Sequence, residues 1–217
     1  MRFFFLSMVL VILAAGAYGE GDPVFRVDFS NPGLTPAQWT LEFKPDGSGH
    51  FHSERGNAAN QDPKMIQPPN IDRDVRVTSK FAVHVFEVAQ HHKYFRSECE
   101  SHLKVAFQGT KKLSYSGPKG AGSCEFNYSK DSEIQALGDS LVAVATTIIE
   151  GARLETLLQH DPLGLDQEIE SVKEAAEDGR AQQICSIRPI LEKLADDPAV
   201  LERVRKRAKA LLARADQ

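Results

Sequence analysis

Apolar and polar residues alternate along two stretches near the start of the chain, the pattern of strands with one buried face. Residues 24–29 read VFRVDF, and Trp39, Leu41 and Phe43 repeat the same spacing. The segment 45–49, PDGSG, is typical of a tight turn, and alternation resumes at residues 50–53, HFHS. We therefore predict a strand at 24–29 followed by a β-hairpin.

Further along, the pattern changes between helical and extended spacing. Apolar residues recur at helical spacing from Lys80 to about Glu98, after a capping Ser79, although the run VHVF leaves a strand open over 81–88. Short strands are predicted at 103–108, 112–115 and 123–128, separated by glycine-containing turns. Residues 55–74 show no period and many polar and proline residues, so we predict a long loop there.

From residue 131 onward the spacing is helical throughout. We predict a long helix capped at Asp131 or Ser132 and ending near residue 159, with a broad apolar face typical of a central core helix. Three further helices follow at 166–177, at 181–195 with a kink at Pro189, and from a cap at 196 or 197 to about 213.

These elements predict an α+β fold: a small antiparallel β-sheet with a packed helix, followed by a C-terminal bundle of about four helices. We divide the chain into a signal peptide at 1–19, a β-rich α+β region at 20–130 and a helical region at 131–217. The helices can form a lobe of their own or pack on the same core as the sheet.

The first nineteen residues resemble a secretory signal peptide. One arginine precedes an apolar run from Phe3 to Ala15, and small residues at 15–19 suit cleavage. The run is shorter than the ~20 residues of a spanning helix, and no later segment is long and apolar enough to span. We therefore expect an exported protein, secreted or periplasmic, with no transmembrane segment after cleavage.

Charge excludes one class of partner. The formal net charge is −4, and residues 20–130 carry 14 lysines and arginines against 13 acidic residues, whereas residues 131–217 carry 11 against 17. Nothing here is basic enough to predict nucleic acid as the main partner. The cationic run at 203–209 is interpreted as a solvated helix face, with membrane or nucleic-acid contact as the minor alternative.

The three cysteines fit an oxidising compartment. We predict a disulfide between Cys99 and Cys124, since neither belongs to a CxxC motif and a zinc site would need two more ligands. Cys185 is left over and is predicted to be a small buried residue of a helical stretch, with a reactive thiol or an intermolecular bridge as the alternative.

The outward face of the hairpin carries the candidate metal ligands. If Phe43 pairs with Gly49, Glu42 lies opposite His50, and His52 points the same way. Two histidines and one carboxylate suit zinc, iron or copper. The simpler interpretation is an exposed polar face without cofactor. A second histidine group, residues 84, 91, 92 and 102, is interpreted as half-buried and solvated side chains, because His84 and His91 lie two helical turns apart.

No segment of the sequence matches a catalytic motif closely enough to predict an activity. The segment 116–123, SGPKGAGS, fails the phosphate-loop spacing, and the chain contains no GxSxG or HExxH motif. Asn127 begins a glycosylation sequon. We expect a non-enzymatic binding module for a protein or cell-envelope component, making contact through the 55–74 loop and the outer hairpin face. The alternatives are a metal-dependent enzyme or metal carrier using Glu42, His50 and His52, and an envelope scaffold that self-associates through its helices.

Overall fold

The first half of the protein contains four strands, one helix and two further strands in chain order, and the second half is helical. The computed structural model describes residues 21–54 and 70–215. Their elements are, in chain order, β1 (Val24–Ser30), β2 (Gln38–Phe43), β3 (Ser48–Glu54), β4 (Ile71–Arg76), α1 (Ser79–His91), the 3-10 turn η1 (Lys93–Phe95), β5 (Thr110–Gly117), β6 (Gly120–Phe126), α2 (Ser132–His160), α3 (Leu165–Glu177), the 3-10 turn η2 (Ile184–Ile187), α4 (Arg188–Asp196) and α5 (Glu202–Ala215).

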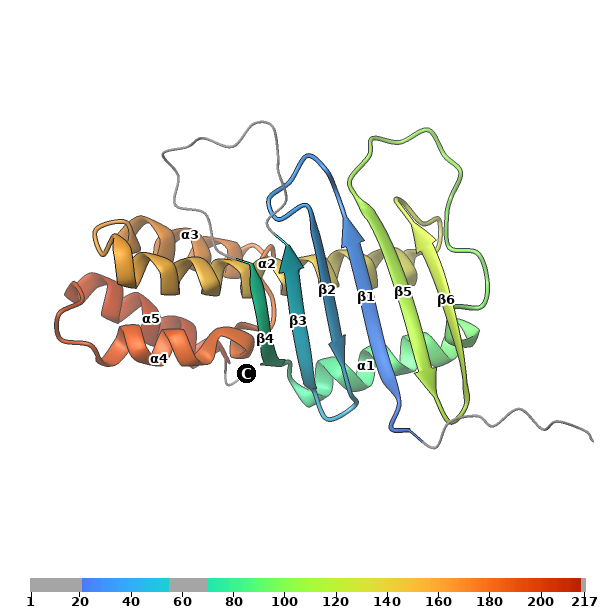
Figure 1. Ribbon diagram of the computed structural model, residues 1–217, viewed down its shortest axis with the longest axis horizontal. Helices are drawn as coiled ribbons and strands as arrows, with labels where there is room; N and C mark the ends of the chain where they lie inside the picture. Colours follow the sequence, from blue (N-terminus) through green and yellow to red (C-terminus); the bar gives the residue numbers. More distant parts are fainter. Residues whose placement is uncertain (1–20, 55–69, 216–217) are drawn as a thin grey trace, which may run out of the picture.

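The strands form one antiparallel sheet in the order β4-β3-β2-β1-β5-β6. Helices α1 and α2 lie behind one face of the sheet, and no helix of the described residues covers the opposite face (Figure 1). The predicted α+β class is therefore confirmed. The predicted hairpin register is also confirmed, since Phe43 pairs with Gly49 and Glu42 with His50.

The tight turn between β2 and β3 explains why this hairpin forms. The Asp46 carboxylate accepts hydrogen bonds from the backbone N–H of Ser48 at 2.9 Å and from its hydroxyl at 2.6 Å. Gly47 has a φ of 83°, and a side chain there would collide with the carbonyl oxygen of Val77. A residue with a side chain would therefore be strained in this turn.

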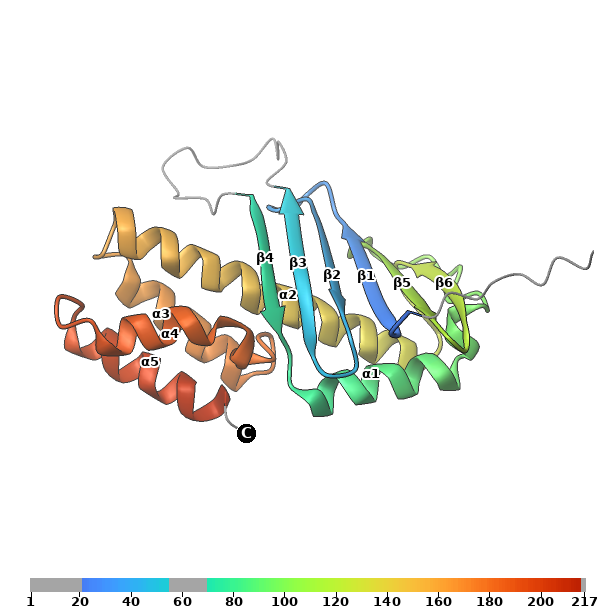
Figure 2. The same ribbon diagram turned by 60° about the horizontal axis from the view of Figure 1, so that its bottom comes forward.

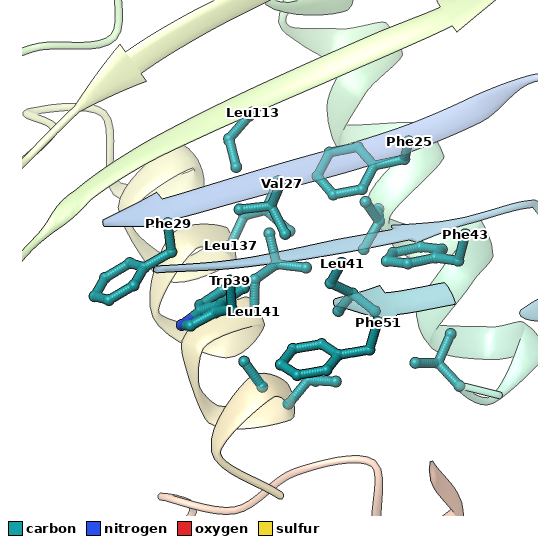
Figure 3. Packing of buried hydrophobic residues seen from close by; sticks show 14 of the residues in the cluster. Phe25, Val27, Phe29, Trp39, Leu41, Phe43, Phe51, Leu113, Leu137 and Leu141 are labelled. Atoms are coloured by element: carbon teal, nitrogen blue, oxygen red, sulfur yellow. The ribbon is translucent and has the colours of Figure 1, made fainter. Parts of the chain in front are cut away.

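Aromatic side chains of the inner strands form the core beneath the sheet. Phe29 and Trp39 stack with ring centroids 5.0 Å apart, and Trp39 lies 6.1 Å from Phe51. Leu137 and Leu141 from the first half of α2 pack below them (Figure 3). Burying this surface is the main stabilising contribution in this part of the molecule.

Helices α3, α4 and α5 lie beside the C-terminal end of α2 (Figure 2). A second apolar cluster contains buried residues of these four helices. The change occurs within α2, where Ala152 belongs to the first cluster and Leu154 to the second. We call the strands, α1 and the part of α2 up to Ala152 the sheet half, and α3, α4 and α5 with the part of α2 from Leu154 onward the helical half.

The disulfide between Cys99 and Cys124 is confirmed. It ties the irregular segment that follows η1 to β6, with the two Cα atoms 5.7 Å apart. The helix prediction that placed Cys99 at a helix end was wrong, because α1 ends at His91. Residues 93–95 then take left-handed backbone angles, and Phe95 becomes fully buried against Phe25.

Two further predictions, one of a loop and one of a strand, were also wrong. Residues 71–74 were expected in a loop but lie in β4, where Arg73 stands opposite Phe51 on the inner face and interrupts the apolar alternation. The rest of that predicted loop, residues 55–69, lies outside the described residues. Residues 103–108 were expected to form a strand but contain none, because no strand among the described residues pairs with them.

The last two helices begin later than predicted. Pro189 lies in the first turn of α4 and does not kink a longer helix. Backbone N–H groups in the first turn have no partner within the helix, so the missing N–H of proline costs no hydrogen bond there. Pro198 lies in a turn before α5, in which Asp197 accepts a hydrogen bond from the N–H of Ala199 at 2.8 Å. Helix α5 therefore starts at Glu202.

Candidate functional site

The open face of the sheet is polar along its whole width. Two rows of outward side chains cross neighbouring strands in register, one through Ser114, Arg26, Glu42, His50 and Asp74. The other row runs through Glu125, Lys112, Asp28, Thr40, His52 and Asp72. Because opposite charges alternate within the rows, the polar groups of this face satisfy one another.

His50 and His52 contact the aspartates of β4. His50 Nδ1 lies 3.0 Å from Asp74 and its Nε2 lies 3.1 Å from Asp72, while His52 Nδ1 is 3.0 Å from Asp72. The hydrogen bond with Asp74 raises the pKa of His50 above its ordinary value, whereas desolvation acts in the opposite direction. The nearby charge of Asp72 acts in the same direction as that hydrogen bond.

Glu42, the third member of the predicted metal set, has a different partner. Its carboxylate lies 3.8 Å from Arg26, which also forms a 2.5 Å ion pair with Asp28. Within residues 21–54 and 70–215, the ligand atoms of Glu42, His50 and His52 do not converge within 4.8 Å of one another. The hairpin set therefore stays a prediction, with the two histidines directed toward β4.

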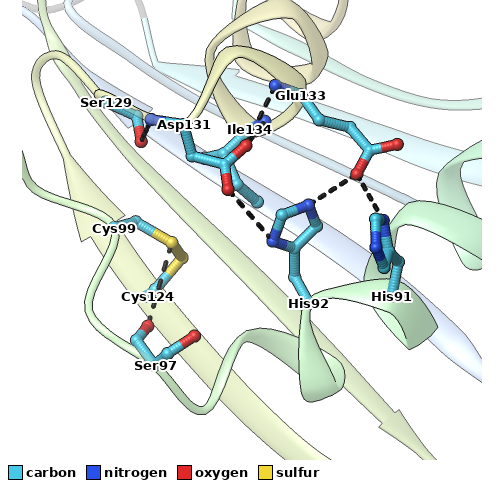
Figure 4. A network of polar contacts seen from close by, with 9 residues as sticks. All are labelled: His91, His92, Ser97, Cys99, Cys124, Ser129, Asp131, Glu133 and Ile134. Atoms are coloured by element: carbon cyan, nitrogen blue, oxygen red, sulfur yellow. Dashed lines mark hydrogen bonds and ion pairs between the residues drawn. A yellow bond between two sulfur atoms is a disulfide. The ribbon is translucent and has the colours of Figure 1, made fainter.

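One group of histidine and acidic side chains does converge in the described part of the chain. His91 Nδ1 lies 2.7 Å from Glu133 Oε2, and His92 Nε2 lies 2.6 Å from the same oxygen (Figure 4). His92 Nδ1 faces Asp131 at 3.5 Å. The hydrogen bond with His92 and, to a smaller extent, the one with His91 hold the pKa of Glu133 below its usual range.

Two helix ends build this cluster. His91 is the last residue of α1 and His92 its C-cap, whereas Asp131 is the N-cap of α2 and Glu133 lies in its first turn. Sequence reasoning missed the carboxylates, which lie about forty residues from the histidines. An adjacent histidine pair at a helix end, and an acidic capping segment at the start of another, were the available signals.

The segment from 96 to 109 exposes three large apolar side chains. Leu103, Val105 and Phe107 are 51%, 43% and 57% exposed, and they alternate along the chain. We call these three residues the apolar strip. Soluble proteins bury most side chains of this kind, so a group of them at the surface marks a candidate contact site.

The apolar strip is held at both ends. The N–H of Ser101 donates to the carbonyl of Tyr128 at 2.9 Å, close to the disulfide at Cys99. At the other end the Asn127 side chain accepts from the N–H of Gln108 at 2.7 Å and donates to the carbonyl of Ala106 at 3.2 Å. The sequon residue thus has a structural role in positioning the apolar strip.

The remaining predicted features have structural partners. Arg203 and Arg207 of the cationic run form ion pairs with Asp166 of α3 at 2.7 and 2.5 Å. Cys185 is half-buried in η2, and its burial raises the pKa of its thiol, which disfavours the reactive thiolate. Its sulfur lies 3.5 Å from the carbonyl oxygen of Arg76.

No protein-family model matches this sequence, and no curated protein matches it either. None of the helices formed by the described residues is both long and apolar enough to cross a membrane. The function must therefore be argued from the sites themselves.

Proposed function

We propose that the protein is an exported, non-enzymatic binding module that contacts a partner protein through the apolar strip. The exposure of Leu103, Val105 and Phe107 carries this proposal. Burying three such side chains against a partner would contribute several kcal/mol before the costs of association, at about 1.5–3 kcal/mol each.

The restraints on the apolar strip support the same proposal. The disulfide and the Asn127 hydrogen bonds fix the segment on either side, so less conformational entropy is lost when a partner binds. The disulfide is also compatible with the oxidising compartment that export implies. The outer hairpin face, the contact site expected from the sequence, offers charged groups that are already paired with one another.

Site-specific cross-linking tests this proposal. A photo-reactive residue replacing Val105, presented to the exported fraction of the source cells, should capture a defined partner. The same residue at Val83 on α1, which is 46% exposed, is the matched control. The purified partner should then bind the Val105→Ser, Phe107→Ser double variant about tenfold more weakly or worse, and Val83→Ser normally.

Capture that is equal at both positions, or binding that the double variant leaves unchanged, would contradict the proposal. Light scattering at several concentrations adds a separate check. If the wild type dimerises and the double variant does not, the strip is a contact between copies, and the proposal of a different partner protein is wrong.

A metal-dependent enzyme or metal carrier remains the alternative function. Support for a metal at Glu42, His50 and His52 comes from the two histidines alone, because the Glu42 carboxylate forms an ion pair with Arg26. Metal analysis of the His50→Ala, His52→Ala double variant tests it. Loss of a stoichiometric metal in this variant would favour the alternative over the binding module.

A further inference from the structure

We propose that His91, His92 and Glu133 form a binding site for a divalent transition metal ion of the zinc type, with Asp131 orienting His92. The site would join the end of α1 to the start of α2. It is distinct from the hairpin set and from the apolar strip.

The donor atoms suit such an ion in kind and in spacing. Two imidazole nitrogens and one carboxylate oxygen form a ligand set that zinc accepts while keeping a fourth position open. Bonds of about 2.0–2.1 Å in tetrahedral geometry place ligand atoms about 3.3 Å apart. The nitrogens of His91 and His92 lie 2.7 and 2.6 Å from the Glu133 oxygen, so small side-chain rotations would admit the ion.

The second contact of His92 is the feature that an incidental surface cluster would lack. Histidines that bind metals usually donate their other ring N–H to a carboxylate, which fixes the ring and its tautomer. Nδ1 of His92 faces Asp131 Oδ2 at 3.5 Å, leaving Nε2 for the ion. The other oxygen of Asp131 is held by the N–H groups of Glu133 at 3.0 Å and Ile134 at 3.2 Å.

Exposure and charge fit the same interpretation. The His92 side chain is only 16% exposed, whereas His91 is 75% exposed, so the site has an anchored side and an open side. Asp131 and Glu133 together supply two negative charges for a dication. The open side would leave room for water as a fourth ligand.

Calorimetric titration of the chelator-treated full protein with zinc tests the proposal. We expect one ion per chain, and loss of binding in His91→Ala and in His92→Ala. Zinc at a hundredfold excess over its dissociation constant should also raise the melting temperature by roughly 5–10 °C. Failure of the wild type to bind zinc would overturn the proposal.

Two conservative variants separate metal binding from folding. Asp131→Asn keeps an N-cap acceptor for α2 but removes the carboxylate behind His92, so zinc affinity should fall about 10- to 100-fold with unchanged circular dichroism. Glu133→Gln should weaken zinc binding at least as much. Unchanged affinity in both variants would contradict the proposed ligand set.

His102 provides the matched control. It pairs with Glu98 at 2.6 Å and is 70% exposed, but it belongs to no converging group of three ligands among the described residues. His102→Ala should bind zinc normally. Binding that is lost in His102→Ala, or in the His50→Ala, His52→Ala variant but not in His92→Ala, would place the metal elsewhere and overturn the assignment.

Discussion

The two halves of the molecule fill their apolar cores with different kinds of side chain. The sheet half packs phenylalanines, a tryptophan and a tyrosine between a flat β-surface and two helices. The apolar cluster of the helical half, within the described residues, contains leucine, isoleucine, valine and alanine but no aromatic ring. Wide rings fill the layer between sheet and helix, whereas interlocking aliphatic side chains suit helices that pack closely.

The two halves also differ in their cysteines and in their buried charged groups. The sheet half is cross-linked by the disulfide, whereas the helical half contains the free Cys185 and an acidic residue, Glu168, buried beside Arg153. Since α2 contributes to both clusters, the two halves are expected to be energetically coupled despite these differences.

Core truncations should have the largest effect and should show whether the halves unfold together. Phe51→Ala in the sheet half should cost about 3–5 kcal/mol, and Leu191→Ala in the helical half about 2–5 kcal/mol, because both side chains are fully buried. Denaturant unfolding followed by Trp39 fluorescence and by circular dichroism is the measurement. Leu191→Ala should shift both transitions, and an unmoved Trp39 transition would show that the halves are independent.

Loss of the disulfide should be next in size. The Cys99→Ser, Cys124→Ser variant should be destabilised by about 3 kcal/mol, because the bridge closes a loop with a sequence separation of 25 residues. Denaturant midpoints give the change, and alkylation checks the bridge. Wild type should take one label before reduction and three afterwards, so three labels without reduction would contradict the bridge.

The buried carboxyl of the helical half should make stability depend on pH. The pKa of Glu168 is raised to about 8, mainly because the carboxyl is buried. The hydrogen bond with Glu150 and the charge of Glu150 also raise this pKa, whereas the charge of Arg153 lowers it. Between the unfolded-state value near 4.5 and about 8, the folded protein keeps a proton that the unfolded chain has lost. Stability should therefore fall with rising pH across this window, by a few kcal/mol at most.

Glu168→Gln mimics the neutral carboxyl and tests that prediction. The variant should equal the wild type near pH 4.5 and become progressively more stable than it toward about pH 8, then keep a constant advantage. Denaturant midpoints across this range measure the difference. A difference that does not change with pH would mean that Glu168 is not the responsible group.

The smallest effect is expected at the contact between the halves. Arg73 of β4 binds Glu155 of α2 through two hydrogen bonds of 2.9 and 2.7 Å, and both side chains are about one-third exposed. A double-mutant cycle with Arg73→Ala and Glu155→Ala should give a coupling of about 0.5–1 kcal/mol. A zero coupling would show that this ion pair contributes nothing to the connection between the halves.

Local patterns predicted the elements whose partners lie close in sequence. The hairpin from Gln38 to Glu54 follows from alternation and a turn with a glycine at its tip, and its register was predicted residue by residue. Helix α2 follows from its cap and apolar spacing. The disulfide followed from the expected compartment and from the absence of a CxxC motif or further zinc ligands, and it is confirmed.

Predictions that depended on distant partners fared worse. The stretch at 103–108 has the alternation of a strand, but a strand exists only where a neighbour supplies hydrogen bonds, and Asn127 holds this segment instead. Strand β4 was missed because its inward-facing position 73 is an arginine, which pairs with Glu155 of α2. Neither neighbour is visible from the local pattern.

The sequence by itself determined the fold class, the hairpin and the long helix, because these rest on periodicity and turn chemistry. It also predicted the pairing of the cysteines, because the expected compartment is oxidising and other cysteine chemistry lacks its motifs. Only the tertiary structure decided which side chains meet. His91 and His92 acquire Glu133 and Asp131 because two helix ends converge, and the apolar strip stays exposed because no described helix or strand covers it. Side-chain convergence depends on how whole elements pack, and residues far apart along the chain carry no local signal of it.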